Sequence, residues 1–370
     1  MKITLSRLDL LAAVNKVKSV VASKSALPIL SHILLETGDS SVKLMATDLK
    51  ISIESETDCA VERPGAMTVQ CQRISMILAE LPVDADVTLE LMDNNVAELR
   101  CGKVCTKLFC QAPDEFPPVK ASPETGAMIL KQAMLKNIFQ KTSFAICSDQ
   151  SRYNLTGLLF ELRNGRLTVV ATDGRRMSMA VADEEVDAND VRVIIPAKMI
   201  HELETLLASD GDSTVDVWVE ESHAAFAFDR LRIVSALIEG NFPNYDAVVP
   251  KKHDREVVVK TEEFIRTMRL SLAVTSDKFR SVRVVAGNGA LKVQVKTPEV
   301  GEFEDEIETS YDGEAVEIAF NPAFILDVLR FIDGEKVCLL LKDTSSPGII
   351  KPYTDAPQDN YVNVVMPIRI

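Results

Sequence analysis

Apolar residues recur at helical spacing in three places, and the places are 125 residues apart. Each set has apolar side chains at i, i+4 and i+7, the spacing of one face of an α-helix. The sets are Ile74, Leu78 and Leu81; Met199, Leu203 and Leu206; and Phe324, Val328 and Phe331. Each set precedes a strand-like segment: Asp86–Met92, Thr214–Val219 and Lys336–Leu341. The pattern predicts one helix–strand unit, repeated three times.

A second helix is predicted near the start of each copy. Ser6-x-x-Asp9 has the form of a capping box. The apolar stripe that follows is Leu10, Val14, Val17 and Val21. The corresponding helices are expected from about Leu130 to Ala145 and from about Thr261 to Val274. Pro196 and Pro322 stand at the starts of the later pair of helices, where proline is tolerated, and Asn321 is a candidate N-cap.

A strand-and-turn motif repeats at the same interval. Ala46-Thr47-Asp48 recurs as Ala171-Thr172-Asp173, and Lys296-Thr297-Pro298 is a degenerate third member. An Asp or Pro after a strand is ordinary turn chemistry, and we expect no more of the first and third copies. Each copy is of normal domain size and reads strand–helix–strands–helix–strands. We therefore expect three domains, at residues 1–122, 127–252 and 253–370, with linkers near 113–126 and 240–256.

Charge narrows the class of function. The 370 residues carry a net charge of −14, which excludes a uniformly basic nucleic-acid coat but allows a local basic face. Nine carboxylates and no Lys or Arg lie between Glu299 and Glu317. Many Lys and Arg residues instead lie in or beside the predicted helices. Helices that all faced one way would form a basic surface able to contact phosphates without reading sequence.

Signals for chemistry are few. There is no Gly-rich phosphate loop, the four histidines are scattered, and the spacing Cys101-x3-Cys105-x4-Cys110 lacks the second pair typical of zinc. His201 is expected on the surface. No apolar run reaches the length of a membrane span, and we expect a cytoplasmic protein with reduced cysteines. A repeat without a distinct catalytic segment favours a non-enzymatic protein without metal or cofactor.

Several segments, in this order across the whole chain, resemble the bacterial sliding clamps, the beta subunits of DNA polymerase III. They are Leu27-Pro28-Ile29-Leu30, Ala46-Thr47-Asp48-Leu49, Ala171-Thr172-Asp173-Gly174-Arg175-Arg176-Met177, Phe242-Pro243-Asn244-Tyr245, Asp277-Lys278-Phe279-Arg280 and Val365-Met366-Pro367-Ile368-Arg369-Ile370. The resemblance implies an α+β DNA-clamp fold with two helices packed on antiparallel sheets in each of three domains. It also implies a head-to-tail homodimeric ring around double-stranded DNA, which acts as a processivity factor in DNA replication.

The family's partner pocket lies between the second and third domains. It would take short peptides of the replicative polymerase, the clamp loader and other proteins with a clamp-binding motif. Carried over residue by residue, it comprises Leu155, Thr172, Gly174, Arg175, Arg176, Met177, Pro243, Val248, Val365, Met366, Pro367, Ile368 and Arg369. Apolar members would form a slot, and the arginines would orient polar parts of the peptide. Asp246-Ala247, Met177 and Ile368 depart from commoner family residues.

The resemblance also implies DNA contacts and a dimer joint. DNA-contacting positions map to Lys24, Gln150, Arg152 and Lys198. The joint would pair the edge strand around Val104–Cys110 with the third domain of the other subunit. Its expected residues are Lys103, Lys107, Leu108, Ala273, Val274, Glu302, Glu304 and Glu306, with the two lysines facing the three glutamates.

Two other classes of function stay open. An enzyme would need a His or Cys with a partner in a pocket. An interaction scaffold that does not bind DNA would share the repeat and the acidity, but it would form no ring and would not associate with circular DNA.

Overall fold

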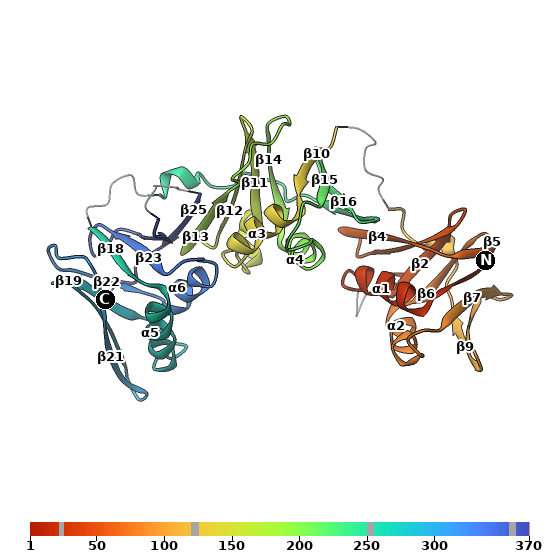
Figure 1. The fold of residues 1–370 in the computed structure, drawn as a ribbon, viewed down its shortest axis with the longest axis horizontal. Coiled ribbons are helices and arrows are strands. Elements are labelled where there is room, and N and C mark those ends of the chain that lie inside the picture. Colours follow the sequence, from red (N-terminus) through yellow and green to blue (C-terminus); the bar gives the residue numbers. More distant parts are fainter. Residues whose placement is uncertain (22–25, 120–125, 250–254, 355–359, 370) are drawn as a thin grey trace. The chain divides into compact units, whose positions relative to one another are not determined.

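The computed structural model describes residues 1–21, 26–119, 126–249, 255–354 and 360–369. They form two compact units, which are described separately (Figure 1). Unit 1 comprises Met1–Gln132 and Thr205–Leu237, and unit 2 comprises Ala133–Glu204 and Ile238–Ile370. Among the described residues, no helix is both long enough and apolar enough to cross a membrane.

The predicted order of elements is confirmed three times along the chain. Each copy opens with a strand and a helix, continues with strands, and closes with a second helix and three strands. The α-helices are α1 (Arg7–Lys18), α2 (Cys71–Glu80), α3 (Gln132–Ser143), α4 (Ala197–Leu206), α5 (Thr261–Ala273) and α6 (Pro322–Leu329). Short 3-10 helices are η1 (Pro28–Ser31), η2 (Pro113–Glu115), η3 (Gln150–Leu155) and η4 (Tyr245–Ala247).

Unit 1 contains two antiparallel sheets. In spatial order the smaller has β5 (Ala60–Arg63), β1 (Lys2–Ser6), β7 (Asp86–Met92), β8 (Val96–Cys101) and β9 (Val104–Phe109). The larger has β10 (Met128–Lys131), β15 (Thr214–Val219), β16 (His223–Phe228), β17 (Leu231–Ala236), β4 (Ile51–Asp58), β3 (Ser41–Thr47), β2 (His32–Thr37) and β6 (Ala66–Gln70). Helix α1 packs against α2 and against β3 and β4.

Unit 2 repeats this plan. Its larger sheet has β14 (Val191–Pro196), β11 (Gly157–Arg163), β12 (Arg166–Thr172), β13 (Arg176–Val181), β25 (Tyr361–Val365), β24 (Gly348–Pro352), β23 (Lys336–Leu341) and β18 (Arg255–Lys260). Its smaller sheet has β21 (Gly301–Glu308), β20 (Ala290–Thr297), β19 (Val282–Gly287) and β22 (Val316–Phe320). Helix α5 packs against α6 and against β20 and β21.

Both large sheets run across the sequence repeats. Strand β4 of the first copy pairs with β17 of the second, and β13 of the second pairs with β25 of the third. The backbone hydrogen bonds of one copy's edge strand are therefore completed by the next copy.

The predicted helix signals are mostly confirmed. The Ser6 hydroxyl caps α1, although it accepts its bond from Leu8 N rather than from Asp9 N. Asn321 Oδ1 accepts from Ala323 N, with Pro322 in the first turn of α6. Arg7, at the start of α1, donates to the carbonyls of Leu78 and Ala79, which ties α1 to the end of α2.

The apolar stripes are only partly buried. Ile74, Leu78, Met199, Leu203 and Val328 are buried as expected, and so is Leu81 just after α2. Leu206, Phe324 and Phe331 are half-buried, so the stripes do not face the core along their full length. The reason is packing between elements: Ile325 and Leu329 of α6 face the core instead, and Phe331 stacks on Phe144 near the end of α3.

The Thr-Asp motif forms a turn, and the turn has similar backbone geometry in each copy. Thr47 and Thr172 donate through Oγ1 to the carbonyls of Ile51 and Arg176. Asp48 and Asp173 accept two backbone N–H groups each. The residues at the tight position are Leu49, Gly174 and Glu299, with φ of 76°, 81° and 68°. Turn chemistry therefore accounts for the motif in the first copy.

Candidate functional site

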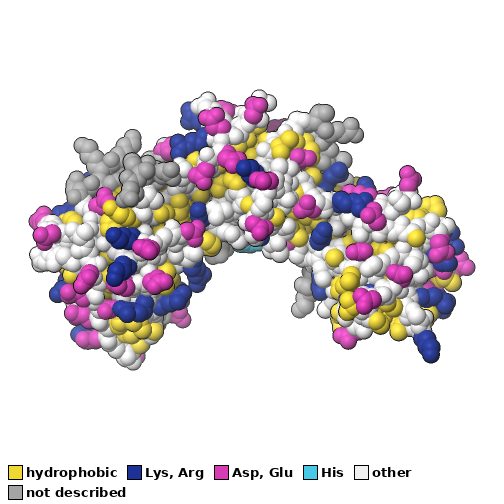
Figure 2. Space-filling model, viewed as in Figure 1, with side chains coloured by type: hydrophobic (Ala, Val, Ile, Leu, Met, Phe, Trp, Pro, Cys, Tyr) yellow, Lys and Arg dark blue, Asp and Glu magenta, His cyan; other side chains and the backbone are white. Residues whose placement is uncertain are grey.

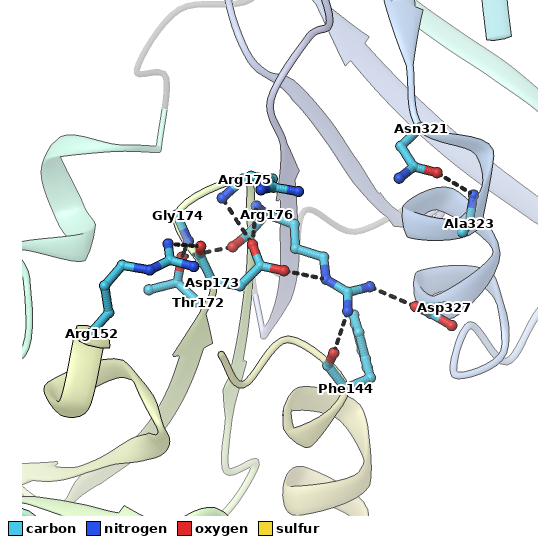
Figure 3. A network of polar contacts seen from close by, with 10 residues as sticks. All are labelled: Phe144, Arg152, Thr172, Asp173, Gly174, Arg175, Arg176, Asn321, Ala323 and Asp327. Atoms are coloured by element: carbon cyan, nitrogen blue, oxygen red, sulfur yellow. Dashed lines mark hydrogen bonds and ion pairs between the residues drawn. The ribbon is translucent and has the colours of Figure 1, made fainter. Parts of the chain in front are cut away.

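The predicted pocket is built around the turn between β12 and β13 (Figure 3). Asp173 Oδ1 accepts from the backbone N of Arg175 and of Arg176, and Gly174 N donates to Thr172 Oγ1. Gly174 adopts a positive φ, and a Cβ there would lie 3.0 Å from Arg152 Nη1. The turn holds Gly174 and Arg175 exposed at its tip.

Arg176 is a connector between elements of the second and third copies (Figure 3). Its side chain is only 12% exposed and forms ion pairs with Asp173 at 3.1 Å and with Asp327 of α6 at 2.6 Å. It also donates to the Phe144 carbonyl at 2.6 Å and lies over the rings of Phe144 and Phe324. All three guanidinium nitrogens thus form hydrogen bonds within the protein. The side chain therefore holds the turn in position and is not a free cation for a ligand.

Two apolar residues of the predicted pocket belong to one hydrophobic core. Leu155 and Met177 are buried in a cluster that includes Phe242 and, from the third copy, Ile349 and Val364. Pro243 and Val248 lie exposed at its margin. Leu155 and Met177 therefore pack against side chains of both copies.

A buried carboxylate holds the segment that carries Pro243 and Val248. Tyr245 Oη donates to Glu161 Oε2 at 2.6 Å, and Arg192 forms an ion pair with the same carboxylate. Burial, followed by the hydrogen bond to Glu161, raises the pKa of Tyr245 above its ordinary range. This support was not predicted from the sequence, although Tyr245 lies in the Phe-Pro-Asn-Tyr segment that resembles the family.

The C-terminal segment crosses from one sheet to the other. Val365 ends β25, Met366 N donates to the Arg175 carbonyl, and Ile368 N donates to the Ala319 carbonyl of β22. Together with Arg175, residues Met366, Pro367, Ile368 and Arg369 line a cavity of about 1310 Å³. Five of the thirteen predicted pocket residues thus border this cavity, beside the turn that carries Thr172 and Gly174.

The predicted DNA contacts are placed unequally. Gln150 and Lys198 are exposed, and Lys24 lies outside the described residues. Arg152 is half-buried, forms an ion pair with Asp149 at 3.3 Å and donates to the Asp173 carbonyl. Hydrogen bonds from Ser151 lower the pKa of Asp149. Arg152 is therefore bound to the Thr172–Arg176 turn on one side.

The predicted joint residues lie at two sheet edges. Strand β9 is an edge of the smaller sheet of unit 1, and β21 is an edge of the smaller sheet of unit 2. Leu108 is half-buried on β9, and Val274 Cγ1 is close to Gly301 at the start of β21. Ala273 is exposed at the end of α5.

Charges at these edges already have partners within the chain. Lys107 lies 3.9 Å from Glu98, while Glu302 and Glu306 form ion pairs with Lys296 and Lys292 of β20. Glu304 accepts from Gln294 at 3.0 Å. Lys103 is exposed in the turn before β9. Such exposed pairs are weak, so they leave these side chains available to other partners.

Strand β9 also carries an exposed aromatic ring that was not among the predicted joint residues. Phe109, the last residue of β9, is 87% exposed, and Val104 at the other end is 45% exposed. An edge strand with exposed apolar residues is a usual place for another chain to pair. The alternation of buried and exposed positions along a strand predicts that Phe109, next to Leu108, faces the other side of β9. It does not predict whether another strand covers this edge of the sheet.

Within the described ranges, no group of three or more His, Cys, Asp or Glu side chains is arranged to hold a metal ion. His201 is exposed as predicted, with Nδ1 3.3 Å from Glu204. Figure 2 shows basic and acidic side chains interspersed on the face in view. This distribution agrees with the exclusion of a uniformly basic coat.

Comparison with known proteins covers the chain from end to end. Family descriptions of the N-terminal, central and C-terminal domains of the DNA polymerase III beta subunit match residues 1–120, 129–244 and 246–369. The "Beta sliding clamp" of Pseudomonas aeruginosa is 31% identical, with 100% of both chains covered.

Solved structures agree with this match. The crystal structure of the DNA polymerase III subunit beta from Pseudomonas aeruginosa has a TM-score of 0.94 and 30% identity, over 100% of both chains. The sliding clamp of Bacillus subtilis has a TM-score of 0.95 and 26% identity, over 100% of this chain and 99% of that one. Matched over its full length in sequence and in fold, the chain belongs to the family of DNA polymerase III beta subunits, the bacterial sliding clamps.

Proposed function

We propose that this chain is the DNA sliding clamp of a replicative polymerase. Two subunits form a head-to-tail ring around double-stranded DNA, and the ring tethers polymerase, clamp loader and other partners through a peptide pocket. It acts in the cytoplasm, where the DNA is, and it catalyses no reaction and needs no metal or cofactor. The proposed domains are residues 1–122, 127–252 and 253–370. Full-length family membership supports this function.

The observation that carries the ring is a pair of unmatched sheet edges. Within the chain, β4 pairs with β17 and β13 pairs with β25. Strands β4, β13 and β21 occupy the same place in the three copies, and we call them the first class. Strands β9, β17 and β25 are the last strands of the three copies and form the second class. Of these six strands, β21 and β9 have no partner of the other class within the described part of the chain. Both are edge strands, so a second subunit can complete the same joint at each end.

The strand register can be carried over from the internal joints. Thr88, Arg100 and Cys105 lie opposite one another across β7, β8 and β9. The matching ladder in the second copy is Asp216, Ala227 and Arg232. Cys105 is therefore the equivalent of Arg232.

Arg232 lies opposite Glu54 in β4. Glu304 occupies the position of Glu54 two repeats later. The carried register thus places Glu304 opposite the partner subunit's Cys105, and Glu302 opposite the partner subunit's Lys107. Phe109 and Val104 would be covered by this pairing. Reversal of Lys103 and Lys107 to Glu should weaken the dimer, and an unchanged dimer would contradict the charge pairing.

The proposed peptide pocket has an apolar slot and a polar rim. Leu155, Met177 and Val365 form the buried base, while Pro243, Val248 and Met366 are accessible to a ligand. Thr172, Gly174 and Arg175 form the rim, continued by Pro367, Ile368 and Arg369. Arg176 serves as a positioning residue, because its donors are engaged within the protein. An extended peptide suits such a slot.

We further propose that Lys24, Gln150, Arg152 and Lys198 contact the DNA backbone. A duplex that slides needs contacts that are weak and independent of sequence, which exposed polar and basic side chains supply. Some N–H groups of Arg152 would contact the DNA while Nη1 donates to the Asp173 carbonyl.

Topological retention tests the function. The protein is loaded on nicked circular DNA with a cognate clamp loader and ATP, and the DNA is then linearised before gel filtration. A clamp stays with the circle and leaves the linear form. Equal retention on both forms would indicate ordinary binding and reject the ring. No retention with a competent loader would favour the scaffold that does not bind DNA.

A further inference from the structure

The cavity beside the peptide pocket extends far beyond it, over the outer face of the smaller sheet of unit 2. We propose that this extension, here called the cationic shelf and defined by Lys278, Phe279, Arg280 and Arg283, binds acidic residues that flank a partner's clamp-binding peptide. The inference rests on the proposed function, since it needs a peptide in the pocket.

The shelf is a built surface with a floor and two walls. Arg283 of β19, Gln294 of β20 and Glu304 of β21 lie opposite one another on one face of that sheet and contribute to its floor. One wall is the segment 277–281, which the Ser276 and Phe279 backbone groups close into a turn by bonding each other. The other wall is the C-terminal segment, fixed where Ile368 N donates to the Ala319 carbonyl.

The shelf is continuous with the peptide pocket. Arg175 and Met366 belong to the proposed pocket, and both also line this cavity. The proposed pocket and the shelf therefore share part of one cavity, so residues that follow a peptide past Met366 would lie between the two walls.

Charge identifies the occupant. The cavity is lined by six cationic and three anionic side chains, in a protein with a net charge of −14. The six are Arg175, Lys278, Arg280, Arg283, Lys296 and Arg369, and the three are Asp277, Glu302 and Glu304. Arg280 pairs with Asp277, Arg283 with Glu317, and Lys296 with Glu302.

The surplus charge is positive and accessible. Among the described residues, no carboxylate pairs with the side chain of Arg175, Lys278 or Arg369, and all three are exposed. Lys278 belongs to the shelf, and the two arginines belong to the adjoining part of the proposed pocket. Carboxylates of a bound segment would supply the missing partners.

The apolar residues favour a peptide over a nucleic acid. Phe279 is half exposed, and Met366, Pro367 and Ile368 line the same space. A peptide segment in which acidic and apolar residues alternate would match these cationic and apolar side chains. A phosphate backbone, with a negative charge at every nucleotide, would instead meet Asp277, Glu302 and Glu304 along its path.

Fluorescence anisotropy tests the shelf. The probe is a labelled peptide from the clamp-binding segment of the cognate polymerase, alone or with Asp-Ala-Glu-Ala or Ser-Ala-Ser-Ala added at either end. We expect the acidic addition at one end to lower the Kd about fivefold at low ionic strength, with less gain at high salt. The neutral addition should leave the Kd unchanged.

Matched variants assign the gain to the shelf. Lys278→Glu should abolish it and leave the Kd of the unextended peptide unchanged, whereas Arg166→Glu, an exposed control on β12 away from the cavity, should keep it. No gain at either end, or a gain that survives Lys278→Glu, would overturn the inference while leaving the pocket intact. Failure of the unextended peptide to bind would instead reject the proposed pocket. Binding of oligothymidylate that depends on Lys278, with no gain for acidic peptides, would assign the shelf to nucleic acid.

Discussion

At the scale of single residues, the structure changes the role of Arg176. The family resemblance implies that it is one of two adjacent arginines that orient polar parts of a bound peptide. Instead it joins Asp173, Asp327 and the Phe144 carbonyl, while Arg175 stays at the exposed tip of the turn. Arg175 and Arg176 thus have different roles, because Arg176 points between two elements and Arg175 points toward solvent.

Removal of the Arg176 side chain should therefore cost much more than removal of its neighbour. Arg176→Ala leaves Asp327 and the Phe144 carbonyl without their partner and should lower the free energy of unfolding by about 2–4 kcal/mol. Arg175→Ala should change it by less than about 0.5 kcal/mol. Denaturant unfolding of both variants measures the difference. Equal stabilities would show that the network contributes nothing net.

The thiols should differ sharply in reactivity. Burial raises the pKa of Cys71 to about 11 and that of Cys338 to about 12, whereas Cys105 is exposed. A thiol reagent near neutral pH should modify Cys105 rapidly, and Cys71 and Cys338 only after unfolding, because the thiolate is the nucleophile. Mass spectrometry of labelled peptides identifies the sites.

The same two thiols give the stability a pH dependence. Their folded pKa values lie above those of the unfolded chain, so the folded state holds the proton longer. The free energy of unfolding should be unaffected below the ordinary thiol pKa and should fall as the pH rises from about 9 toward 11–12. Replacement of both cysteines by alanine should remove this part of the alkaline loss.

At the scale of elements, the repeat preserves backbone geometry more faithfully than residue identity. The turns after β3, β12 and β20 all have a residue with positive φ at the same repeat position. Only the second turn has glycine there, and Leu49 and Glu299 adopt the same conformation at a steric cost. The alignment of the three copies is thus visible in the backbone even where the motif is lost.

Exchange of residues at this position should have opposite effects in the first two copies. Leu49→Gly relieves the strained φ and should leave stability unchanged or raise it by up to about 1 kcal/mol. Gly174→Ala introduces the strain and meets Arg152, and should destabilise by about 1–2 kcal/mol. Thermal unfolding of the two variants compares the signs. A loss at both positions would refute their equivalence.

At the scale of the whole molecule, each large sheet continues from one copy of the repeat into the next. Pairing of β4 with β17 and of β13 with β25 joins successive copies, and it leaves β9 and β21 as the unused members of the two classes. The proposed ring follows from repeating one joint until no edge of this type remains.

A disulfide across subunits tests the register of that joint. Glu304→Cys should form one with the native Cys105 of the partner, because opposite residues of antiparallel strands lie within disulfide reach, with Cα atoms roughly 4.5–5.5 Å apart. Oxidation should give a covalent dimer on a non-reducing gel, and Cys105→Ser should prevent it. Glu306→Cys is the matched control, displaced along the strand. Equal cross-linking from both positions would contradict the register.

The sequence by itself determined the number of copies, the order of elements and most helix positions, since 3.6-residue periodicity and caps are local signals. Ser6 and Asn321 show this, because each caps the helix that follows it. The strands after the second helices were likewise predicted with their observed bounds. It also marked the residues of the candidate pocket through a family resemblance, although no local pattern could tell which of them are accessible.

Only the tertiary structure decided which strands are edges, where Phe324 and Phe331 point, and that Arg176 is engaged on all three nitrogens. These facts depend on contacts between residues far apart in the chain. Spacing along the sequence says which face of an element a side chain occupies, but not what covers that face. Pairing and packing through space supply that information, and the proposed pocket, the proposed shelf and the open edges are all defined by it.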